Sequence, residues 1–561
     1  MTDPNRNALA ARVLMQELAA GGVRHVAVSP GSRSAPLALA ARRTLEVSVH
    51  TDERCGGFFA LGLARASGRP VALVCTSGTA GAHYLPAVIE ARASRVPLVV
   101  LTADRPDVLL DAGAPQTMDQ EGLLTPYVRF QQTIQVGAAS ERGVRWLRAR
   151  VGRALEAARS GPVHLNLRFD EPLSDVRVPG DVPDGLGAVE QAFAPSIAGR
   201  AAMPVEAVAP LLRAERPVVV AGPQSPASAR VLAEALGAPL LADPLSGLRE
   251  GAVTGFDALV RFPDLAEALA PDLVVHVGRT PTCKHLGIAH ERHGVRRVVF
   301  DASDEREDPH HLGTTYVRSE DLPALVPHVA SAPREWLARW RAAESAVAVA
   351  RSAALEKAPL GFEGTLFRGL FAAMPKEGRL LVASSMPVRQ LDAFWAGGPQ
   401  EVVANRGVNG IDGLVSTTFG IAADGRPTWA VLGDLALLHD LGGFAAAPRL
   451  GLAPVVVVIN NGGGGIFSYL PLAKTAEAGE FSQLFTTPHQ TTFAPLADLF
   501  GLDYARPGTE AELAAALMQG ARAKLVELTV DREDSVARHR AFWADAADRA
   551  RAALGLTGAG A

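Results

Sequence analysis

The sequence predicts an α/β protein whose three domains each contain a parallel sheet flanked by helices. Short apolar runs of strand length alternate with helical stretches almost throughout the chain. Runs that are hydrophobic on both faces are typical of parallel sheets covered on both sides. The length of 561 residues, with 48% hydrophobic and 20% charged residues, is enough for several globular cores. The predicted strands are residues 23–29, 70–77, 97–104, 217–222, 273–278, 296–303, 379–385 and 454–460.

Two stretches mark candidate domain boundaries. Residues 178–187 are rich in Pro, Gly and Asp, and residues 333–358 form an Ala/Arg-rich helical stretch that precedes a new β-α series. We therefore expect domains at residues 1–180, 190–335 and 355–561.

Composition and charge exclude two classes of partner. The formal net charge is −4 and no block of Lys and Arg occurs, so a nucleic-acid surface is not expected. No apolar run approaches the ~20 residues needed to span a membrane.

Residues 1–20 have the pattern of an amphipathic helix rather than of a signal peptide. The three cysteines, Cys55, Cys75 and Cys283, have unrelated spacings, which favours buried thiols in a reducing cytoplasm.

An internal repeat links the first and third domains. Shifting the chain by 357 residues superposes several Gly and Pro positions and two strands, which suggests two copies of one sheet. The alternative is that any two α/β domains share such Gly and Pro positions. If the repeat is real, the copies differ at their strand ends, where α/β sheets bind ligands. The superposed pairs include Gly56 with Gly413, 68–70 with 425–427, Pro97 with Pro454, 99–104 with 456–461, Ser77 with Asp434, and Asp104 with Asn461.

A candidate metal site follows two strands of the third domain. The run TWAVLGD ends at Asp434, and PVVVVIN is followed by Asn461, 27 residues further on. This interval fits a helical crossover over residues 440–451 between neighbouring parallel strands. A carboxylate, an amide oxygen and a carbonyl of the glycine loop, assigned to Gly463, form a partial shell for Mg²⁺, and the glycines let a diphosphate approach the backbone. The alternative is a strand that ends in a flexible capped turn.

The same residues resemble a known fingerprint. Gly-Asp followed at this interval by Asn-Asn is similar to the thiamine diphosphate and Mg²⁺ motif of thiamine diphosphate enzymes. Many members have Gly-Asp-Gly, whereas this chain has Leu435 in the third position. That variant resembles the 2-succinyl-5-enolpyruvyl-6-hydroxy-3-cyclohexene-1-carboxylate synthase family of menaquinone biosynthesis. The resemblance weakens only in the middle domain, and the blocks that carry it are 29–40, 50–64, 75–80, 101–106, 114–120 and 405–420.

The resemblance implies a thiamine diphosphate-binding fold, with a pyrimidine-binding domain and a pyrophosphate-binding domain around a middle domain. It implies thiamine diphosphate and Mg²⁺, for which Mn²⁺ could substitute. The implied reaction is decarboxylation of 2-oxoglutarate and conjugate addition of the succinyl carbanion equivalent to isochorismate. Family members clamp the cofactor between two subunits, so we expect a dimer at least, with a tetramer left open.

The resemblance also implies site residues. Glu53, between the predicted strand EVSVH and a helix, would hydrogen-bond the aminopyrimidine, and Gln116 would lie beside the reacting carbons. Pro115 and His285 stand where relatives often carry asparagine and arginine, so those contacts are not transferred. The other implied cofactor-binding residues are Ser385, Ile411, Gly433, Asp434, Asn461 and Phe467. The implied substrate-binding residues are Ser32, Arg33, Arg105, Lys284, Arg389 and Arg406, although each arginine alone is more often a surface cation.

Other functions remain open from the sequence. An acetohydroxyacid synthase or a 2-oxoacid decarboxylase would share Glu53, Asp434 and Asn461, but small uncharged acceptors would not need so many arginines. A noncatalytic nucleotide-binding protein would use the middle domain, where no G-x-G-x-x-G turn occurs. A zinc site from Cys283, His285, His290 and His293 matches no standard spacing. No G-x-S-x-G elbow occurs, which argues against an α/β hydrolase.

Overall fold

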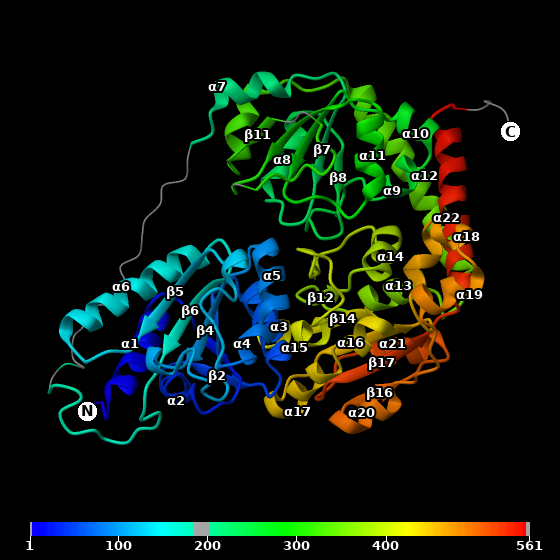
Figure 1. The fold of residues 1–561 in the computed structure, drawn as a ribbon. Helices are drawn as coiled ribbons and strands as arrows, with labels where there is room; N and C mark the ends of the chain where they lie inside the picture. Colours follow the sequence, from blue (N-terminus) through cyan, green and yellow to red (C-terminus); the bar gives the residue numbers. More distant parts are fainter. Residues whose placement is uncertain (1–2, 185, 187–201, 304, 313–314, 557–561) are drawn as a thin grey trace.

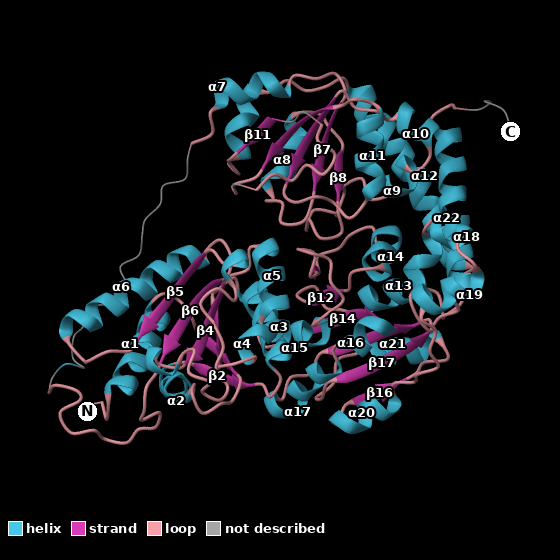
Figure 2. Ribbon diagram, in the orientation of Figure 1, coloured by secondary structure: helices cyan, strands magenta, loops and turns pink. Residues whose placement is uncertain are grey.

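The structure is a computed structural model that describes residues 3–184, 186, 202–303, 305–312 and 315–556. It contains three sheets in which every described strand pair is parallel, so the predicted α/β class is confirmed (Figure 1; Figure 2). Helices cover the sheets on their faces, as the two-sided apolar runs predict. Within the described part of the chain, no helix is both long enough and apolar enough to cross a membrane.

The first sheet has six strands in the order β2-β1-β3-β4-β6-β5. Its strands are β1 (His25–Val28), β2 (Glu46–Val49), β3 (Val71–Cys75), β4 (Leu98–Asp104), β5 (Phe130–Gln135) and β6 (Val163–Arg168). Its helices are α1 (Arg6–Ala20), α2 (Ala35–Thr44), α3 (Glu53–Ser67), α4 (Ala80–His83), α5 (Leu85–Ser94), η1 (Asp107–Leu109), η2 (Thr125–Tyr127) and α6 (Glu141–Ala158). Helix α1 buries one apolar face, as its sequence pattern predicts.

The middle sheet has five strands in the order β11-β10-β9-β7-β8. Its strands are β7 (Pro217–Ala221), β8 (Leu240–Ala242), β9 (Leu273–Val277), β10 (Arg296–Phe300) and β11 (Thr315–Val317). The helices here are α7 (Val205–Val208), η4 (Ala209–Leu212), α8 (Ser228–Ala235), α9 (Phe256–Val260), α10 (Pro263–Ala268), α11 (Lys284–Arg292), η5 (Leu322–His328) and α12 (Arg334–Glu356).

The third sheet has six strands in the order β13-β12-β14-β15-β17-β16. Its strands are β12 (Arg379–Val382), β13 (Glu401–Val403), β14 (Thr428–Gly433), β15 (Val455–Asn460), β16 (Asp503–Ala505) and β17 (Lys524–Thr529). Its helices are α13 (Glu363–Ala373), α14 (Met386–Phe394), α15 (Leu414–Ala422), α16 (Asp434–His439), η6 (Leu441–Ala445), α17 (Ala446–Leu450), η7 (Gly465–Tyr469), α18 (Leu472–Thr475), α19 (Ala478–Phe481), η8 (Ser482–Thr486), α20 (Ala494–Phe500) and α21 (Glu510–Leu517). The last helix, α22 (Arg532–Ala553), follows β17 and packs against α12 of the middle domain.

The outer sheets are two copies of one topology. Strand by strand, β12 to β17 take the places that β1 to β6 take in the first sheet. Val71 begins β3 and Thr428 begins β14, while Leu98 begins β4 and Val455 begins β15, so both pairs keep the spacing of 357 residues. A shared strand order at a constant spacing is a stronger sign of a repeat than shared glycines and prolines. The structure therefore supports the repeat that the sequence suggests.

Equivalent helices of the two copies, α3 and α15, pack against each other and join the outer domains (Figure 1). They approach so closely that a Cβ atom on Gly62 would lie 2.2 Å from the backbone oxygen of Thr417. A Cβ atom on Gly420 would lie 2.0 Å from the backbone oxygen of Phe59. Only glycine allows this backbone contact. Because Glu53 begins α3, the contact also sets the position of that residue relative to the third domain.

Seven of the described strands were not predicted, and the predicted crossover is not one helix. Four of these strands have only three residues, and three mix polar with apolar side chains, so neither group makes an apolar run. The crossover consists of α16, η6 and α17 in succession. Gly442 and Gly443 lie in it, and glycine disfavours a continuous helix. The strands not predicted are β5, β6, β8, β11, β13, β16 and β17.

Candidate active site

A pocket of about 190 Å³ lies at the carboxyl edge of the third sheet. Strands β14 and β15 are neighbours there, with Gly433 paired to Ile459. The residues that follow the two strands therefore meet, as their spacing predicts. The pocket is lined by Ser384, Ser385, Met386, Pro387, Gln390, Ile411, Gly433, Asp434, Leu435, Ala436, Ile459, Asn461, Gly463, Gly464, Gly465, Ile466 and Phe467.

The side chains of Asp434 and Asn461 and the carbonyl of Gly463 meet in this pocket. One end of the Asn461 amide lies 3.3 Å from Asp434 Oδ2 and 2.6 Å from the carbonyl oxygen of Gly463. With its nitrogen at this end, the amide donates hydrogen bonds to both oxygens. Turned over, the amide directs its oxygen there, so that three oxygens converge, an arrangement that a bound cation stabilises. The residues therefore fit a hard divalent cation, which prefers carboxylate, amide and carbonyl oxygens.

The Asp434 carboxylate is held by backbone groups. Its Oδ2 accepts hydrogen bonds from the N–H groups of Asn461 at 3.1 Å and Gly463 at 2.9 Å, and its Oδ1 accepts from Leu435 at 2.7 Å. Burial raises the pKa of Asp434, and these N–H groups oppose that shift because they favour the charged form. The carboxylate is therefore fixed in direction and desolvated before any ligand binds.

The glycine loop is held down by a segment that the sequence analysis does not identify. Gly463 has φ 137°, and a Cβ atom there would lie 2.1 Å from the carbonyl oxygen of Thr486. The same carbonyl accepts a hydrogen bond from Gly464 at 2.8 Å. His489 also comes from this segment, and its Nε2 lies 3.3 Å from Asp434 Oδ2. The loop thus owes its order partly to residues 486–489, and no local sequence signal indicates them.

A strained residue begins helix α14 at the side of the pocket. Ser385 has φ 72° and ψ −130°, a backbone conformation that is costly outside glycine and is often found at functional sites. The helix that follows has nine residues, and its amino-terminal end carries partial positive charge. Ile411 and Phe467 supply apolar walls of the same pocket. An anion bound beside the three oxygens would therefore also meet a helix amino terminus.

A second set of polar residues gathers at the carboxyl edge of the first sheet. Arg105 Nη1 donates to Ser77 Oγ at 2.7 Å and its Nη2 donates to the Pro115 carbonyl at 2.8 Å. Gln116 Nε2 donates to the Ser77 carbonyl at 3.0 Å. Gln116 also has a strained φ of 57°. Ser77 therefore orients Arg105, which the resemblance assigns to substrate binding, and Gln116, which it places beside the reacting carbons.

Arg33 and Glu53 share this edge. Arg33 Nη1 donates to the carbonyl of Phe169 at 3.0 Å. Burial lowers the pKa of Arg33, and the charge of Arg105 lowers it further, so the two guanidinium groups are close. Burial, with the nearby Glu53 carboxylate, raises the pKa of the Cys75 thiol at the end of β3. The edge therefore brings the cations Arg33 and Arg105 and the carboxylate of Glu53 to the same end of the sheet as the buried Asp104.

A third set lies where the middle domain meets the third. Burial lowers the pKa of Arg406 to about 10, and the charge of Arg389 contributes to the shift. The backbone after Arg406 is fixed by Glu90 of helix α5, which accepts hydrogen bonds from Gly407 N at 2.8 Å and Val408 N at 2.9 Å. A buried carboxylate of the first domain thus holds the loop that carries Arg406.

Lys284 and His285 begin helix α11 of the middle domain, and Lys284 is exposed. His285 Nδ1 lies 3.2 Å from Asp257 Oδ1, and Cys283 Sγ donates to the same oxygen at 2.9 Å. These three side chains offer ligand atoms within 4.8 Å of one another. The other oxygen of Asp257 pairs with Arg261 at 2.7 Å, so hydrogen bonds and one ion pair account for the cluster. Sequence spacing did not indicate Asp257.

The structure divides the predicted site residues among these places. Seven line the pocket of the third domain, and Glu53 is not among its lining residues. These seven are Ser385, Ile411, Gly433, Asp434, Asn461, Gly463 and Phe467. The first sheet carries Ser32, Arg33, Glu53, Arg105 and Gln116, and the junction with the middle domain carries Arg389 and Arg406. Lys284 lines a separate hollow within the middle domain.

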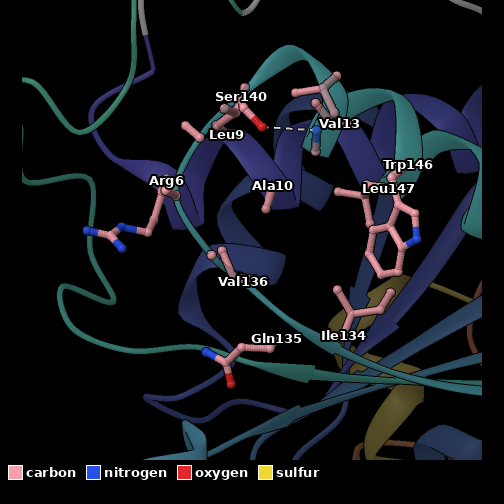
Figure 3. A pocket seen from close by; sticks show the side chains of 15 residues that line it. Arg6, Leu9, Ala10, Val13, Ile134, Gln135, Val136, Ser140, Trp146 and Leu147 are labelled. Atoms are coloured by element: carbon pink, nitrogen blue, oxygen red, sulfur yellow. Dashed lines mark hydrogen bonds between the residues drawn. The ribbon is translucent and has the colours of Figure 1, made fainter.

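Another hollow, of about 100 Å³, lies beside the edge strand β5 (Figure 3). Its walls are mainly apolar and come from α1, β5 and α6, with Leu9, Val13 and Trp146 among them. Arg6 lines it too, but the Arg6 guanidinium pairs with Asp181 at 2.7 Å and points away from the other residues in Figure 3. This hollow therefore offers no free charged group and is not the candidate site.

Comparison with known proteins decides the family. The model "Thiamine pyrophosphate enzyme, N-terminal TPP binding domain" matches residues 9–123, and its C-terminal counterpart matches residues 385–528. The 2-succinyl-5-enolpyruvyl-6-hydroxy-3-cyclohexene-1-carboxylate synthase of Chloroflexus aurantiacus is 41% identical, with 94% of each chain covered. The synthases of Myxococcus xanthus and Geobacillus kaustophilus are 40% and 39% identical, covering 97% and 96% of this chain and 98% and 97% of their own.

The chain belongs to this synthase family. It is an enzyme that depends on thiamine diphosphate, which is another name for thiamine pyrophosphate. The resemblance that the sequence motifs indicate is thereby confirmed, and a noncatalytic nucleotide-binding protein is not supported. The two family models fall on the two copies of the repeat, so the repeated sheets are the two cofactor-binding domains of the synthase fold.

Proposed function

We propose that this synthase decarboxylates 2-oxoglutarate and adds the remaining four-carbon unit to isochorismate, giving 2-succinyl-5-enolpyruvyl-6-hydroxy-3-cyclohexene-1-carboxylate. The relatives carry the name of that product, and both substrates are dianions. The single observation that carries the proposal is the pocket in which the Asp434 carboxylate, the Asn461 amide and the Gly463 carbonyl meet, each of which can offer an oxygen to a cation. Such a shell suits Mg²⁺, which in turn holds diphosphate oxygens.

In this proposal the chain binds and orients the reactants. Bound thiamine diphosphate supplies a carbon nucleophile that can also accept the electron pair released with carbon dioxide. Asp434 and its neighbours would hold the metal, and the amino terminus of α14 would face the diphosphate. Glu53 would hold a proton on the pyrimidine ring and so set its tautomer. Arg33, Arg105 and the Arg389–Arg406 pair would bind substrate carboxylates, because guanidinium groups match carboxylates in charge and shape.

The site needs a second subunit in this proposal. Glu53 does not line the pocket of its own chain, although the proposed chemistry brings it to the cofactor. Two copies related by a two-fold axis would each supply Glu53 to the other's pocket, since such an interface is reciprocal. A mixture of Glu53→Gln and Asp434→Asn subunits should then regain activity. Mixed dimers would contain one intact site, giving roughly a quarter of the wild-type sites after random exchange. No recovery after demonstrated subunit exchange would contradict shared sites.

The cytoplasm is the proposed location. All three cysteines are free and buried, and thiols of this kind are typical of proteins in a reducing compartment.

The test of function is product identification. The purified protein would be incubated with thiamine diphosphate, Mg²⁺ and 2-oxoglutarate, with and without isochorismate, and the products identified by mass spectrometry. We expect the adduct only when both substrates are present, together with carbon dioxide. Succinic semialdehyde as the sole product in both reactions would instead identify a decarboxylase. Unchanged 2-oxoglutarate in both reactions would reject the proposal.

A further inference from the structure

A buried acid with no cationic partner lies behind the cofactor pocket. Glu363, the first residue of α13, is only 1% exposed. It accepts hydrogen bonds from Ser535 Oγ at 2.7 and 2.9 Å and from Gln390 Nε2 at 2.7 Å. Among the residues that the structure describes, no Lys or Arg pairs with it. Burial raises the pKa of Glu363 to about 7, against the opposing effect of the Ser535 hydrogen bond.

Gln390 connects this acid to the pocket. Its side chain is 2% exposed and belongs to the lining of the pocket that holds the three converging oxygens. Its Nε2 is used by Glu363, whereas its Oε1 has no hydrogen-bond partner in the described structure. A buried carbonyl oxygen without a partner is costly, so this atom is expected to find one when a ligand binds.

The protonation state of Glu363 decides which end of the Gln390 amide can face the pocket. An ionised carboxylate only accepts, so the amide must turn its N–H₂ group to Glu363 and its oxygen to the pocket. A protonated carboxyl group has one O–H group, and the amide oxygen can accept a hydrogen bond from it. The amide then turns over and presents its N–H₂ group to the pocket. An anion in the pocket would repel the amide oxygen of the first arrangement. It would accept a hydrogen bond from the N–H₂ group of the second.

We propose that Gln390 donates a hydrogen bond to the anionic end of bound thiamine diphosphate, and that Glu363 positions it by taking up a proton on binding. This inference rests on the proposed cofactor site. It makes Glu363 a positioning residue, since it touches Gln390 and not the ligand. Gln390 itself is a further ligand-binding residue that sequence motifs did not indicate.

The groups around Glu363 favour the protonated state. Helix α22 contributes Asp534, whose negative charge raises the pKa of Glu363, together with Ser535 and His539. Burial lowers the pKa of His539 to about 4, so it is uncharged near neutral pH, and its Nδ1 is bound to the Ser535 carbonyl at 2.7 Å. Segment η7 contributes Tyr469, and burial raises the pKa of that hydroxyl. None of these groups supplies a positive charge that would hold Glu363 ionised.

The test counts protons during cofactor binding. Thiamine diphosphate would be titrated calorimetrically into the Mg²⁺-loaded protein at several pH values from 6 to 8.5, in pairs of buffers with different ionisation enthalpies. Because the cofactor and the metal also exchange protons, each variant is compared with the wild type. Above pH 7 the wild type should take up as much as one proton more than Glu363→Gln. Its dissociation constant should also rise, relative to that variant, by a factor that approaches tenfold per pH unit.

Two more variants complete the test. Gln390→Leu should bind the cofactor more weakly at pH 6.5. It should also lose the extra proton uptake, because no side chain then links Glu363 to the ligand by hydrogen bonds. Ser535→Ala removes a hydrogen bond to Glu363 but keeps the acid, so it should keep the proton uptake, with the onset moved to higher pH because that hydrogen bond lowers the pKa of Glu363. If Glu363→Gln does not fold, Gln390→Leu decides alone. Equal proton uptake by the wild type and by Glu363→Gln would overturn the inference, and so would equal uptake by the wild type and Gln390→Leu where Glu363→Gln does not fold. Absence of Mg²⁺-dependent cofactor binding by the wild type would instead reject the proposed function.

Discussion

Replacing Asp434 with asparagine should weaken Mg²⁺-dependent binding of thiamine diphosphate by about a thousandfold. The substitution keeps the size of the side chain but removes the only charge among the three converging oxygens. Two unit charges 4 Å apart interact by about 4 kcal/mol at an effective dielectric constant near 20, and a metal ligand is closer than that. Since about 1.4 kcal/mol corresponds to a factor of ten, the loss is on the order of three powers of ten.

The assay is a titration of the cofactor, followed by calorimetry or tryptophan fluorescence, at several Mg²⁺ concentrations. Glu527→Gln is a matched control in the same sheet. Glu527 is also fully buried and accepts three hydrogen bonds, from Asn460 Nδ2, Phe493 N and Tyr504 Oη, but it does not line the pocket. The control should lose stability and keep its Mg²⁺ dependence. The metal assignment fails if Asp434→Asn binds the cofactor with wild-type affinity and with an unchanged response to Mg²⁺.

Three other substitutions test separate parts of the molecule. Glu53→Gln should keep cofactor affinity within a few-fold while turnover falls at least about a hundredfold, the usual size of a lost proton-transfer group; near-normal turnover would contradict its role. Arg105→Ala should raise the KM for isochorismate, and kinetics that are unaltered at limiting acceptor would count against that contact. Gly420→Ala forces a Cβ atom to 2.0 Å from the Phe59 carbonyl, so urea unfolding should show a loss of about 1–3 kcal/mol or more. The control for Gly420→Ala is Gly137→Ala, because a Cβ atom at Gly137 meets no atom within 4 Å; its free energy of unfolding should change by less than about 0.5 kcal/mol.

The central strands of each sheet could be predicted from the sequence, but the edges could not. Strand β4 is buried along its whole length and β15 is buried up to its last residue, so apolar and β-branched side chains form a visible run in each. Strand β5 reads FQQTIQ because one side of it is less covered, and its apolar content is too low to stand out. Three-residue strands such as β13 are shorter than any pattern that can be counted.

The same distinction applies to the site. Asp434 and Asn461 could be found because they follow consecutive strands, and parallel strands end at one edge. His489 and Gln390 reach the pocket from elements that only tertiary packing brings there, so no local spacing identifies them. Glu90 accepts a hydrogen bond from the backbone of Gly407, more than 300 residues away in the sequence, and so holds the loop that carries Arg406. This contact exists only once the domains are packed, so the sequence gives no sign of it.

The repeat relates the edge of the third sheet that we propose as the metal site to the edge of the first sheet that holds Arg105. At the spacing of 357 residues, Ser77 takes the place of Asp434 and Asp104 takes the place of Asn461. Ser77 accepts a hydrogen bond from Arg105, and Asp104 Oδ1 accepts from the Arg105 backbone N–H at 2.8 Å. These two positions therefore hold the Arg105 side chain and backbone, whereas in the proposed function their counterparts Asp434 and Asn461 hold a metal ion. A site that needs both chemistries must bring the two edges together, and Glu53 lies on the edge that the pocket of its own chain does not include.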